Sequence, residues 1–573
     1  MRYFLKISKL KKGDYLQIYE SEYFAGKGGR NKSFKALGYV EELKKKDIKN
    51  PVEYYKKEVE RMNDELKAKY ALKITSKPVE IYLGHFVLNS LLNELNVKET
   101  MGILSRNKRF QFDVFESLKS LIFAQIINPT SKYKTWEETL PSLYGAQEVS
   151  YDQLLETVEF LGEHQSKIIQ LFNFQYEKFF KRDYTHLLFD CTNYYFEIDL
   201  PDEDKQKGPS KENRKDPIIG QALLLDANQI PITMEMFPGN CSEKGYIRKM
   251  IDDTKKKYGI NGRTIQIADK GLNCAKNIYS AAVLGNDGYI YSQKIKSNAK
   301  INAYKNFVLG EDEPWTEFKS ANGKLSYKLK SRILENTYTL DDGEKFTVKQ
   351  KWVGVFNASL RSKQLIEINK QIDKATKLSS IKVAEKEEYG DAVKYVSFQS
   401  VDKNGEKTKI VPVLNQSKIN EDLELAGYSV LITSEINMTE DEIYQNYHRL
   451  WKIEESFRVM KTYLEARPVF LTKAVRIYGH FLICYLALFL TRILEINVLS
   501  RKISDSKIIE FIRNFRFANY TENEYVNLST ENQVLKEIAS LTGLTILDNL
   551  YLTKKQIKSI YEVDLALENI AKL

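Results

Sequence analysis

Hydrophobic and polar residues alternate with different periods in successive parts of the chain. In residues 1–50 two runs with the two-residue period of strands, YFLKIS and DYLQIYES, precede a Gly-rich loop, which predicts a short β-meander. Residues 51–180 instead show the three-to-four-residue spacing of amphipathic helices. From about residue 181, short apolar runs bounded by turn residues alternate with helical segments, which predicts an α/β sheet.

The α/β pattern is interrupted and then resumes. Residues 295–427 are charged, with short strand candidates and one amphipathic helix, and predict an inserted β-rich subdomain. Residues 428–495 return to a buried strand followed by helices, so the core is expected in two parts, 181–294 and 428–495. Residues 496–573 predict a helical C-terminal region, a candidate for dimerisation.

One apolar run is long enough to raise the question of a membrane. Ile477 to Thr491 falls short of the ~20 residues that a membrane-spanning helix needs and contains His480, so we interpret it as a buried core helix. The N-terminal residues have no apolar stretch typical of a signal peptide. These features predict a soluble cytoplasmic protein that contacts no membrane.

The charge balance favours a polyanionic partner. Lys and Arg number 87 against 77 Asp and Glu, giving a net charge of +10. Basic residues gather in the N-terminal loop (Lys27, Arg30, Lys32) and at a junction between predicted helices (Arg106, Lys108, Arg109), with Lys132 and Lys134 at the next junction. A DNA-contacting arm and a solvated loop are equally compatible with the first cluster, and the second suits a helical region that binds DNA ends. The four cysteines show no CxxC spacing, which argues against a disulfide framework or a zinc site.

The segment 447–461 carries the least expected charge. Read as one helix, Tyr447, Glu454 and Lys461 fall seven residues apart on one face. Leu450, Trp451 and Phe457 lie on or beside that face, so it is expected to pack inward, with Trp451 in the core. A carboxylate among apolar residues is costly unless a cation or a hydrogen-bond network compensates it, whereas Glu455 fits a solvated surface.

Two further carboxylates are expected near Glu454. Asp190 and Asp269 each end an apolar strand candidate, where α/β sheets place functional groups, although Asp also commonly ends strands for reasons of turn geometry. Three converging carboxylates repel each other and are tolerated mainly around hard divalent cations. Two Mg²⁺ ions, with Mn²⁺ as a substitute, would suit an in-line phosphoryl displacement.

These motifs resemble the insertion-sequence DDE transposases, in the branch with the Tyr-Arg-Glu-Lys signature. The resemblance covers roughly residues 125–495 and rests on FDCTNYYFE with Asp190, IADKG with Asp269, the helix with Glu454, and a turn that includes Phe237, Gly239, Asn240, Ser242 and Glu243. It implies a ribonuclease H-like mixed sheet flanked by helices and interrupted by the β-rich insertion. It also implies that Asp190, Asp269 and Glu454 bind the metal ions, while Ser242 and Glu243 either support that site or stabilise the turn.

The chain departs from the signature at one place. Tyr447, Glu454 and Lys461 match, but Leu450 stands where the family has Arg, and Arg449 comes one position early. Arg449 is therefore expected to point about 100° away from the family position, with Arg458 as a substitute. By resemblance, Tyr447 and Lys461 contact the transposon-end DNA. His480 and Arg467 are interpreted as structural supports of the long helix.

The sequence thus predicts a transposase that binds terminal inverted repeats, cleaves their 3′ ends and joins them to target DNA. The resemblance implies a homodimer that pairs two DNA ends. Two alternatives remain open: a ribonuclease H-like nuclease that cuts without joining, and an inactive relative that only binds DNA.

Overall fold

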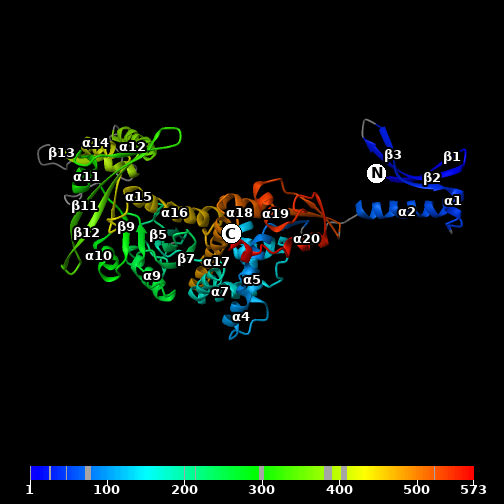
Figure 1. Ribbon diagram of the computed structural model, residues 1–573, viewed down its shortest axis with the longest axis horizontal. Helices are drawn as coiled ribbons and strands as arrows, with labels where there is room; N and C mark the ends of the chain where they lie inside the picture. The colour runs from blue at the N-terminus through cyan, green and yellow to red at the C-terminus, as the bar shows by residue number, and fades with distance from the viewer. Residues whose placement is uncertain are drawn as a thin grey trace. The chain divides into compact units, whose positions relative to one another are not determined.

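The protein is described by a computed structural model (Figure 1) that divides into two compact units. The first comprises residues 1–81, 518–526 and 551–554, and the second comprises the remainder. The structure describes residues 2–24, 28–46, 48–70, 79–198, 200–212, 214–295, 302–379, 390–401, 409–521 and 523–572.

The N-terminal residues form the β-meander that the alternating runs predict. Strands β1 (Arg2–Leu10), β2 (Gly13–Phe24) and β3 (Gly28–Tyr39) pair antiparallel in that order, and helices α1 (Val40–Lys44) and α2 (Pro51–Tyr70) follow. A second small sheet has the order β18 (Tyr551–Thr553), β17 (Glu524–Asn527), β16 (Arg516–Thr521) and β4 (Glu80–Tyr82). The C-terminal region expected to be helical therefore also contains strands.

Helices dominate the next part of the chain. Those that precede the central sheet are α3 (Phe86–Glu94), α4 (Val97–Ser105), α5 (Val114–Ile127), α6 (Lys132–Lys134), α7 (Tyr151–Glu163) and α8 (Gln165–Glu177), with the π-helix η1 (Thr135–Thr139) and the 3₁₀ helix η2 (Leu140–Ser142). Asp113 caps α5 and Ser150 caps α7 through a capping box, so these helices begin where their sequences place acceptors for free backbone N–H groups.

The largest element is a nine-stranded sheet in the order β10-β11-β12-β15-β9-β8-β5-β6-β7. Strands β5 (His186–Tyr195), β6 (Ile218–Leu225) and β7 (Pro231–Pro238) are antiparallel neighbours, while β8 (Ile265–Ala268) and β9 (Gly288–Gln293) run parallel to β5. This order, an antiparallel meander continued by parallel strands, is that of a ribonuclease H-like core. The predicted fold class, a mixed sheet flanked by helices, is confirmed.

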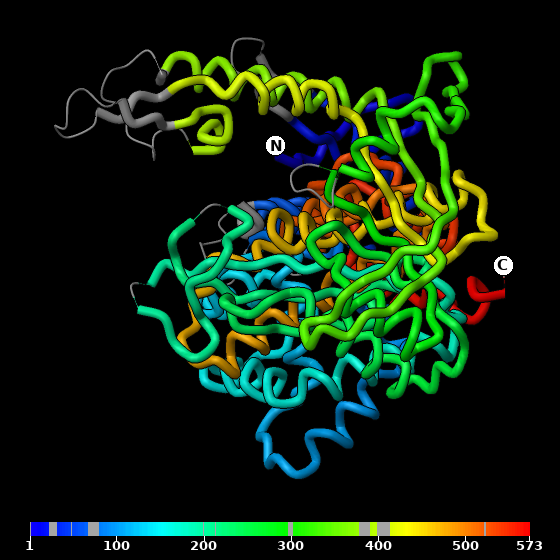
Figure 2. The backbone as a smooth tube through the Cα atoms, turned by 90° about the vertical axis from the view of Figure 1, so that its left-hand side faces the viewer, coloured from blue at the N-terminus to red at the C-terminus, as the bar shows by residue number. Residues whose placement is uncertain are grey.

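The interruption of the core is only partly a separate subdomain. Strands β10 (Thr316–Lys319), β11 (Leu325–Thr339) and β12 (Lys345–Asn357) extend the central sheet, because β12 pairs with β15 (Tyr428–Thr433) over Lys351–Phe356. The rest has its own small apolar core and runs along the upper edge of Figure 2. It contains α12 (Ala358–Ser379), η4 (Gly390–Tyr395), β13 (Val396–Val401), β14 (Lys409–Leu414) and α14 (Gln416–Glu424), while α11 (Asn302–Leu309) packs on β12 and β15.

Helices cover both faces of the sheet. On one face, Leu187, Phe189 and Cys191 of β5 share a core with α9 (Lys244–Lys257), α10 (Ala275–Tyr279) and η3 (Ser280–Leu284). The opposite face carries α15 (Glu440–His448), α16 (Trp451–Arg458) and α17 (Ala474–Ile493), with η5 (Val459–Tyr463) between α16 and α17. Because strand residues alternate between faces, Asp190 lies on this second face.

Helix α17 is the buried core helix that its apolar run predicts. With η6 (Leu494–Val498) it is long and apolar enough to cross a membrane by composition, but 89% of its most apolar window is buried inside the protein. It crosses α7 closely, since a Cβ on Gly479 would overlap the carbonyl oxygen of Val158 and one on Gly162 would overlap that of Val475. After it come α18 (Asp505–Asn514), α19 (Gln533–Thr542), α20 (Lys554–Tyr561) and α21 (Leu567–Ile570).

Candidate active site

Two of the predicted carboxylates stand on neighbouring strands in matched register. Phe189 of β5 pairs with Ala268 of β8, so Asp190 and Asp269 each follow one member of a parallel pair, on strands about 4.8 Å apart. Asp269 follows the end of β8, as predicted. Asp190 does not end its strand, because β5 continues to Tyr195 by pairing with β6, a hydrogen-bond partner that the apolar run alone does not reveal.

The surroundings of Asp190 make its negative charge costly. Its side chain is only 20% exposed. Burial raises the pKa of Asp190 to about 6, with smaller increases from Asp269 and Glu243, although Lys211 and the backbone N–H of Cys191 oppose the increase. The ammonium of Lys211 lies 4.0 Å from Asp190 and 3.7 Å from Glu243. Glu243, which the sequence places either in a supporting role or in a turn, therefore faces the carboxylate site.

The prediction for the helix with Glu454 is wrong about which residues face inward. Glu454 is exposed, and Trp451 is exposed by 44% rather than buried in the core. The buried face of α16 consists of Lys452, Ile453, Ser456 and Phe457. Glu455, expected on the solvated surface, has a side chain only 10% exposed.

The cause is a change of helical pitch between α15 and α16. The N–H groups of Lys452 and Ile453 donate to the carbonyls of Arg449 and Leu450, three residues earlier, at 3.1 and 3.0 Å. Such a 3₁₀ turn advances about 120° per residue instead of 100°, so the face of α15 that carries Tyr447 does not continue unchanged into α16. Leu450 is buried at this turn, and Arg449 is exposed and interacts electrostatically with Asp183 and His186 near the start of β5.

A buried network of charges fixes α16 against α17. Arg492, fully buried, lies 3.2 Å from Glu455, 2.5 Å from Glu495 and 3.3 Å from Asp505. Lys452 completes it, 2.6 Å from Glu455 and 3.1 Å from Glu495. This network holds the inner face of α16 and thereby leaves Glu454 on the outer face. Nothing in the local sequence signals it, because Arg492 is 37 residues from Glu455.

Tyr447 connects the helices to the carboxylates. Its hydroxyl donates a hydrogen bond of 3.0 Å to Asp269, and both Asp269 and Glu454 interact electrostatically with it. Tyr447 thus lies between the two strand carboxylates, which also interact with each other electrostatically, and the exposed Glu454. The DNA contact predicted for Tyr447 stays a prediction, and the structure adds a role in orienting Asp269.

The donor set suits a hard divalent cation, because all its members are carboxylate oxygens and because burial raises the pKa of Asp190, a cost that Lys211 only partly offsets. The carboxylates are not clustered, however: among the residues that the structure describes, no three His, Cys, Asp or Glu side chains are grouped to hold a metal ion. Asp190 and Asp269 would hold the metal ions first, and exposed Glu454 would have to move toward them.

The predicted DNA-contacting residues lie in different environments. Arg458 is exposed by 63%, and Lys32, Arg106 and Arg109 are also exposed. Lys108 lies 2.6 Å from Glu163, so an ion pair already engages it. Lys461 is largely buried beside Glu212, a partner that the sequence did not suggest. Lys27 and the side chain of Arg30 lie outside the described residues.

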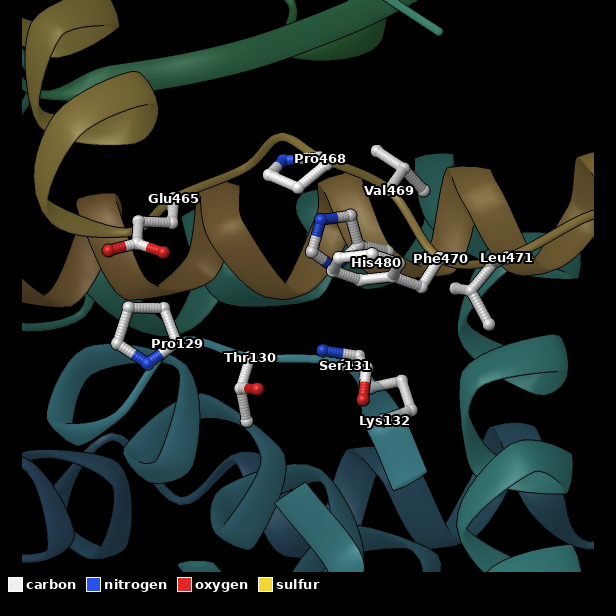
Figure 3. A pocket seen from close by; sticks show the side chains of 10 residues that line it. All are labelled: Pro129, Thr130, Ser131, Lys132, Glu465, Pro468, Val469, Phe470, Leu471 and His480. Carbon is white, nitrogen blue, oxygen red and sulfur yellow. The ribbon is translucent and has the colours of Figure 1, made fainter. Parts of the chain in front are cut away.

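Lys132 was predicted at a basic junction, but it is buried. Its side chain is 4% exposed, donates to Gln125 at 2.8 Å, and has a pKa lowered to about 8 by burial. It lines a cavity of about 220 Å³ together with Thr130, Pro468 and His480 (Figure 3). Nε2 of His480 lies 3.1 Å from the carbonyl of Ala466, in keeping with its predicted structural role.

Comparison with known proteins gives a structural likeness and no sequence match. No family model and no curated protein sequence matches the chain. The structure is similar to that of the piggyBac transposase in a synaptic complex with hairpin DNA, with a TM-score of 0.36 and 11% sequence identity over 76% of this chain and 80% of that chain. A likeness of this size carries no information about function.

Proposed function

We propose that this protein is a DDE transposase that acts on the ends of an insertion sequence and belongs to the branch with the Tyr-Arg-Glu-Lys signature. The observation that supports it most is the placement of Asp190 and Asp269 in matched register on parallel strands, with the helix of Glu454 packed on β5. The order of strands around them is that of a nuclease core in which such carboxylates serve phosphodiester chemistry.

In the proposed reaction, two Mg²⁺ ions, or Mn²⁺ in their place, would activate a water or a 3′-hydroxyl and stabilise the leaving oxygen. Asp190 and Asp269 provide the fixed part of the site, and the hydroxyl of Tyr447 orients the carboxylate of Asp269 through its 3.0 Å hydrogen bond. Glu454 is the carboxylate that would move toward the metal ions, because its side chain is exposed on α16. The inner face of that helix is fixed by the ion pairs of buried Arg492.

The substrate in this proposal is double-stranded DNA carrying terminal inverted repeats. The protein hydrolyses the phosphodiester at the 3′ ends and then transfers those ends to target DNA, as a homodimer that pairs two ends in the cytoplasm. The net charge of +10 and the exposed Lys32, Arg106 and Arg109 support binding to a polyanion, with an affinity that falls steeply as salt rises.

The test is cleavage of labelled DNA that includes the regions flanking the gene, in Mg²⁺, by wild type and Glu454→Gln. Gln keeps the shape of the side chain and removes its charge. Glu156→Gln is the matched control, because Glu156 is also an exposed helical carboxylate of the second unit. We expect wild type and the control to cut and join, while Glu454→Gln binds the DNA and does neither.

Other outcomes select the alternatives. Nicked products without joined strands would favour a nuclease that lacks strand transfer. Binding without cleavage by all three proteins would identify an inactive DNA-binding relative, and the buried Leu450 in the place of the signature Arg would be the first suspect.

A further inference from the structure

A charged loop lies beside the carboxylates of the candidate active site and makes ion pairs in two directions. It precedes β6, and its consecutive residues Lys211 and Glu212 point to different partners. Lys211 lies 4.0 Å from Asp190 and donates a hydrogen bond to the carbonyl of Cys191. Glu212 lies 3.4 Å from the ammonium of Lys461 and 3.0 Å from the guanidinium of Arg467.

The loop is anchored at the same place on β5. The side-chain amide of Asn193 donates to the carbonyl of Pro209 at 3.1 Å, and the backbone N–H of Lys211 donates to the side-chain oxygen of Asn193 at 3.3 Å. Asn193 lies three residues beyond Asp190 on the strand. Residues 209–212 are therefore held beside the carboxylates by two hydrogen bonds to one side chain; we name this segment the strap.

The two cations that pair with Glu212, Lys461 and Arg467, are positioned to bind an anion. The ammonium of Lys461 lies 5.3 Å from the ring centre of Tyr194, and the guanidinium of Arg467 lies 4.7 Å from that of Tyr195. These consecutive strand residues fix the two cations beside the end of β5. The Nε–H of Arg467 is buried and has no hydrogen-bond partner among the described residues.

The neighbouring charges agree with this assignment. Burial lowers the pKa of Lys461, and the carboxylate of Glu212 opposes that decrease, while Arg467 and Lys211 add to it. Two cationic groups thus pair with the carboxylate of Glu212, and Lys211 is a third cation close enough to act on Lys461. A group with one negative charge and several acceptor oxygens fits between Lys461 and Arg467, and a DNA backbone phosphate has that chemistry.

We propose that Lys461 and Arg467 form a binding site for a DNA backbone phosphate next to the carboxylates, and that Glu212 occupies it as an internal substitute until DNA displaces the strap. Displacement also removes Lys211 from Asp190. This inference rests on the proposed function for the identity of the polyanion, but it concerns binding and not the chemical step.

The proposal predicts an affinity that the strap reduces. If the strap is open in about one molecule in ten, DNA affinity is lowered about tenfold relative to a permanently open protein. Glu212→Gln keeps the length of the side chain and removes the charge that holds Lys461 and Arg467. We expect this variant to bind DNA about five- to tenfold more tightly than wild type.

The experiment measures binding of a labelled DNA duplex, without divalent cations, over a range of sodium chloride concentrations. The matched control is Glu197→Gln, because Glu197 lies in the same loop, is 69% exposed, and pairs with Arg214 instead. Lys461→Gln and Arg467→Gln should each weaken binding and lower the slope of log affinity against log salt by about one. Thermal unfolding of each variant verifies that it is folded.

A variant that lacks both cations separates the displacement of Glu212 from a general effect of charge on DNA binding. In a protein that already carries Lys461→Gln and Arg467→Gln, Glu212→Gln should no longer change the affinity, because the site that it blocked is gone. Hydrogen exchange gives a second measure: amides of residues 210–212 should lose protection when the duplex binds wild type, and should lack that protection in free Glu212→Gln.

The outcomes distinguish the two proposals. Equal affinity of wild type and Glu212→Gln, an equal gain in Glu197→Gln, or a gain that persists without both cations would overturn the phosphate site, even if wild type cleaves DNA. Tight binding that follows the expected pattern without any cleavage would support the site and refute the transposase activity. A wild type that binds no DNA would overturn both.

Discussion

Replacing Asp190 with Asn should stabilise the metal-free protein at neutral pH. The carboxylate is 20% exposed, and burial raises its pKa from 3.8 to about 6. A shift of about two pKa units corresponds to roughly 3 kcal/mol of differential stability between the protonated and ionised forms. Asn keeps the shape of the protonated acid and carries no charge, so it avoids that cost at every pH.

The sign follows from proton binding. Between pH 3.8 and about 6 the folded protein holds a proton on Asp190 that the unfolded chain has released, so stability falls as pH rises through this window. Above pH 6 the full cost is present, and below pH 3.8 it is absent. The stability difference between Asp190→Asn and wild type should therefore grow from near zero at pH 3.5 to about 3 kcal/mol at pH 7.

Chemical denaturation in the presence of a chelator measures this difference on the transition that reports the core. Asp183 provides a control of opposite sign: burial raises its pKa, but hydrogen bonds from Thr185 outweigh burial and lower it. Asp183→Asn should thus destabilise the protein at neutral pH. Added Mg²⁺ should stabilise wild type more than Asp190→Asn. A difference that is independent of pH, or a less stable Asp190→Asn protein at pH 7, would refute the reasoning.

Three further substitutions test other parts of the structure. Arg492→Met should lower the free energy of unfolding by about 3–5 kcal/mol, because it removes the cation that pairs with buried Asp505 and leaves Glu455 and Glu495 to share Lys452. Arg458→Met, at a side chain that is 63% exposed, should change it by less than about 0.5 kcal/mol, and equal effects would contradict the role of the network. Gly479→Ala should cost about 1–3 kcal/mol by forcing α7 and α17 apart, while Gly102→Ala, with open space around it, should not destabilise; thermal unfolding compares them. Tyr447→Phe should lower cleavage about tenfold with DNA affinity unchanged within a factor of two, and a loss of affinity instead would indicate a direct DNA contact.

The sequence predicts those features that depend on short-range patterns. Apolar runs followed by Asp identify the strands of Asp190 and Asp269, because a buried strand needs only a few consecutive apolar residues. The apolar run does not predict where β5 ends, since the pairing with β6 that extends the strand depends on residues 218–225. Likewise, the strands placed in a separate insertion join the central sheet through β12 and β15, a pairing that hydrophobic periodicity cannot specify.

The orientation of α16 shows a second limit. Periodicity assigns an inner face to Glu454 only if the helix keeps one pitch, and the 3₁₀ turn at Arg449 and Leu450 changes it. Glu455 could be buried because Arg492, distant in sequence, compensates its charge. Lys132 is a similar case, since burial lowers the pKa of its ammonium and the hydrogen bond that it donates to Gln125 depends on the packed structure.

The long segment between β9 and β15 has a consequence for synthesis on the ribosome. Asp190 and Asp269 precede it, and Glu454 follows it, about 185 residues after Asp269. At roughly 5–20 residues per second, a growing chain spends on the order of 10–40 s with two carboxylates made and the third absent. Strand β9 also lacks its neighbour β15 during that time, so its edge is open to pairing with other chains. Any product that terminates within this segment lacks the helix of Glu454, and premature termination therefore yields proteins that contain Asp190 and Asp269 without Glu454.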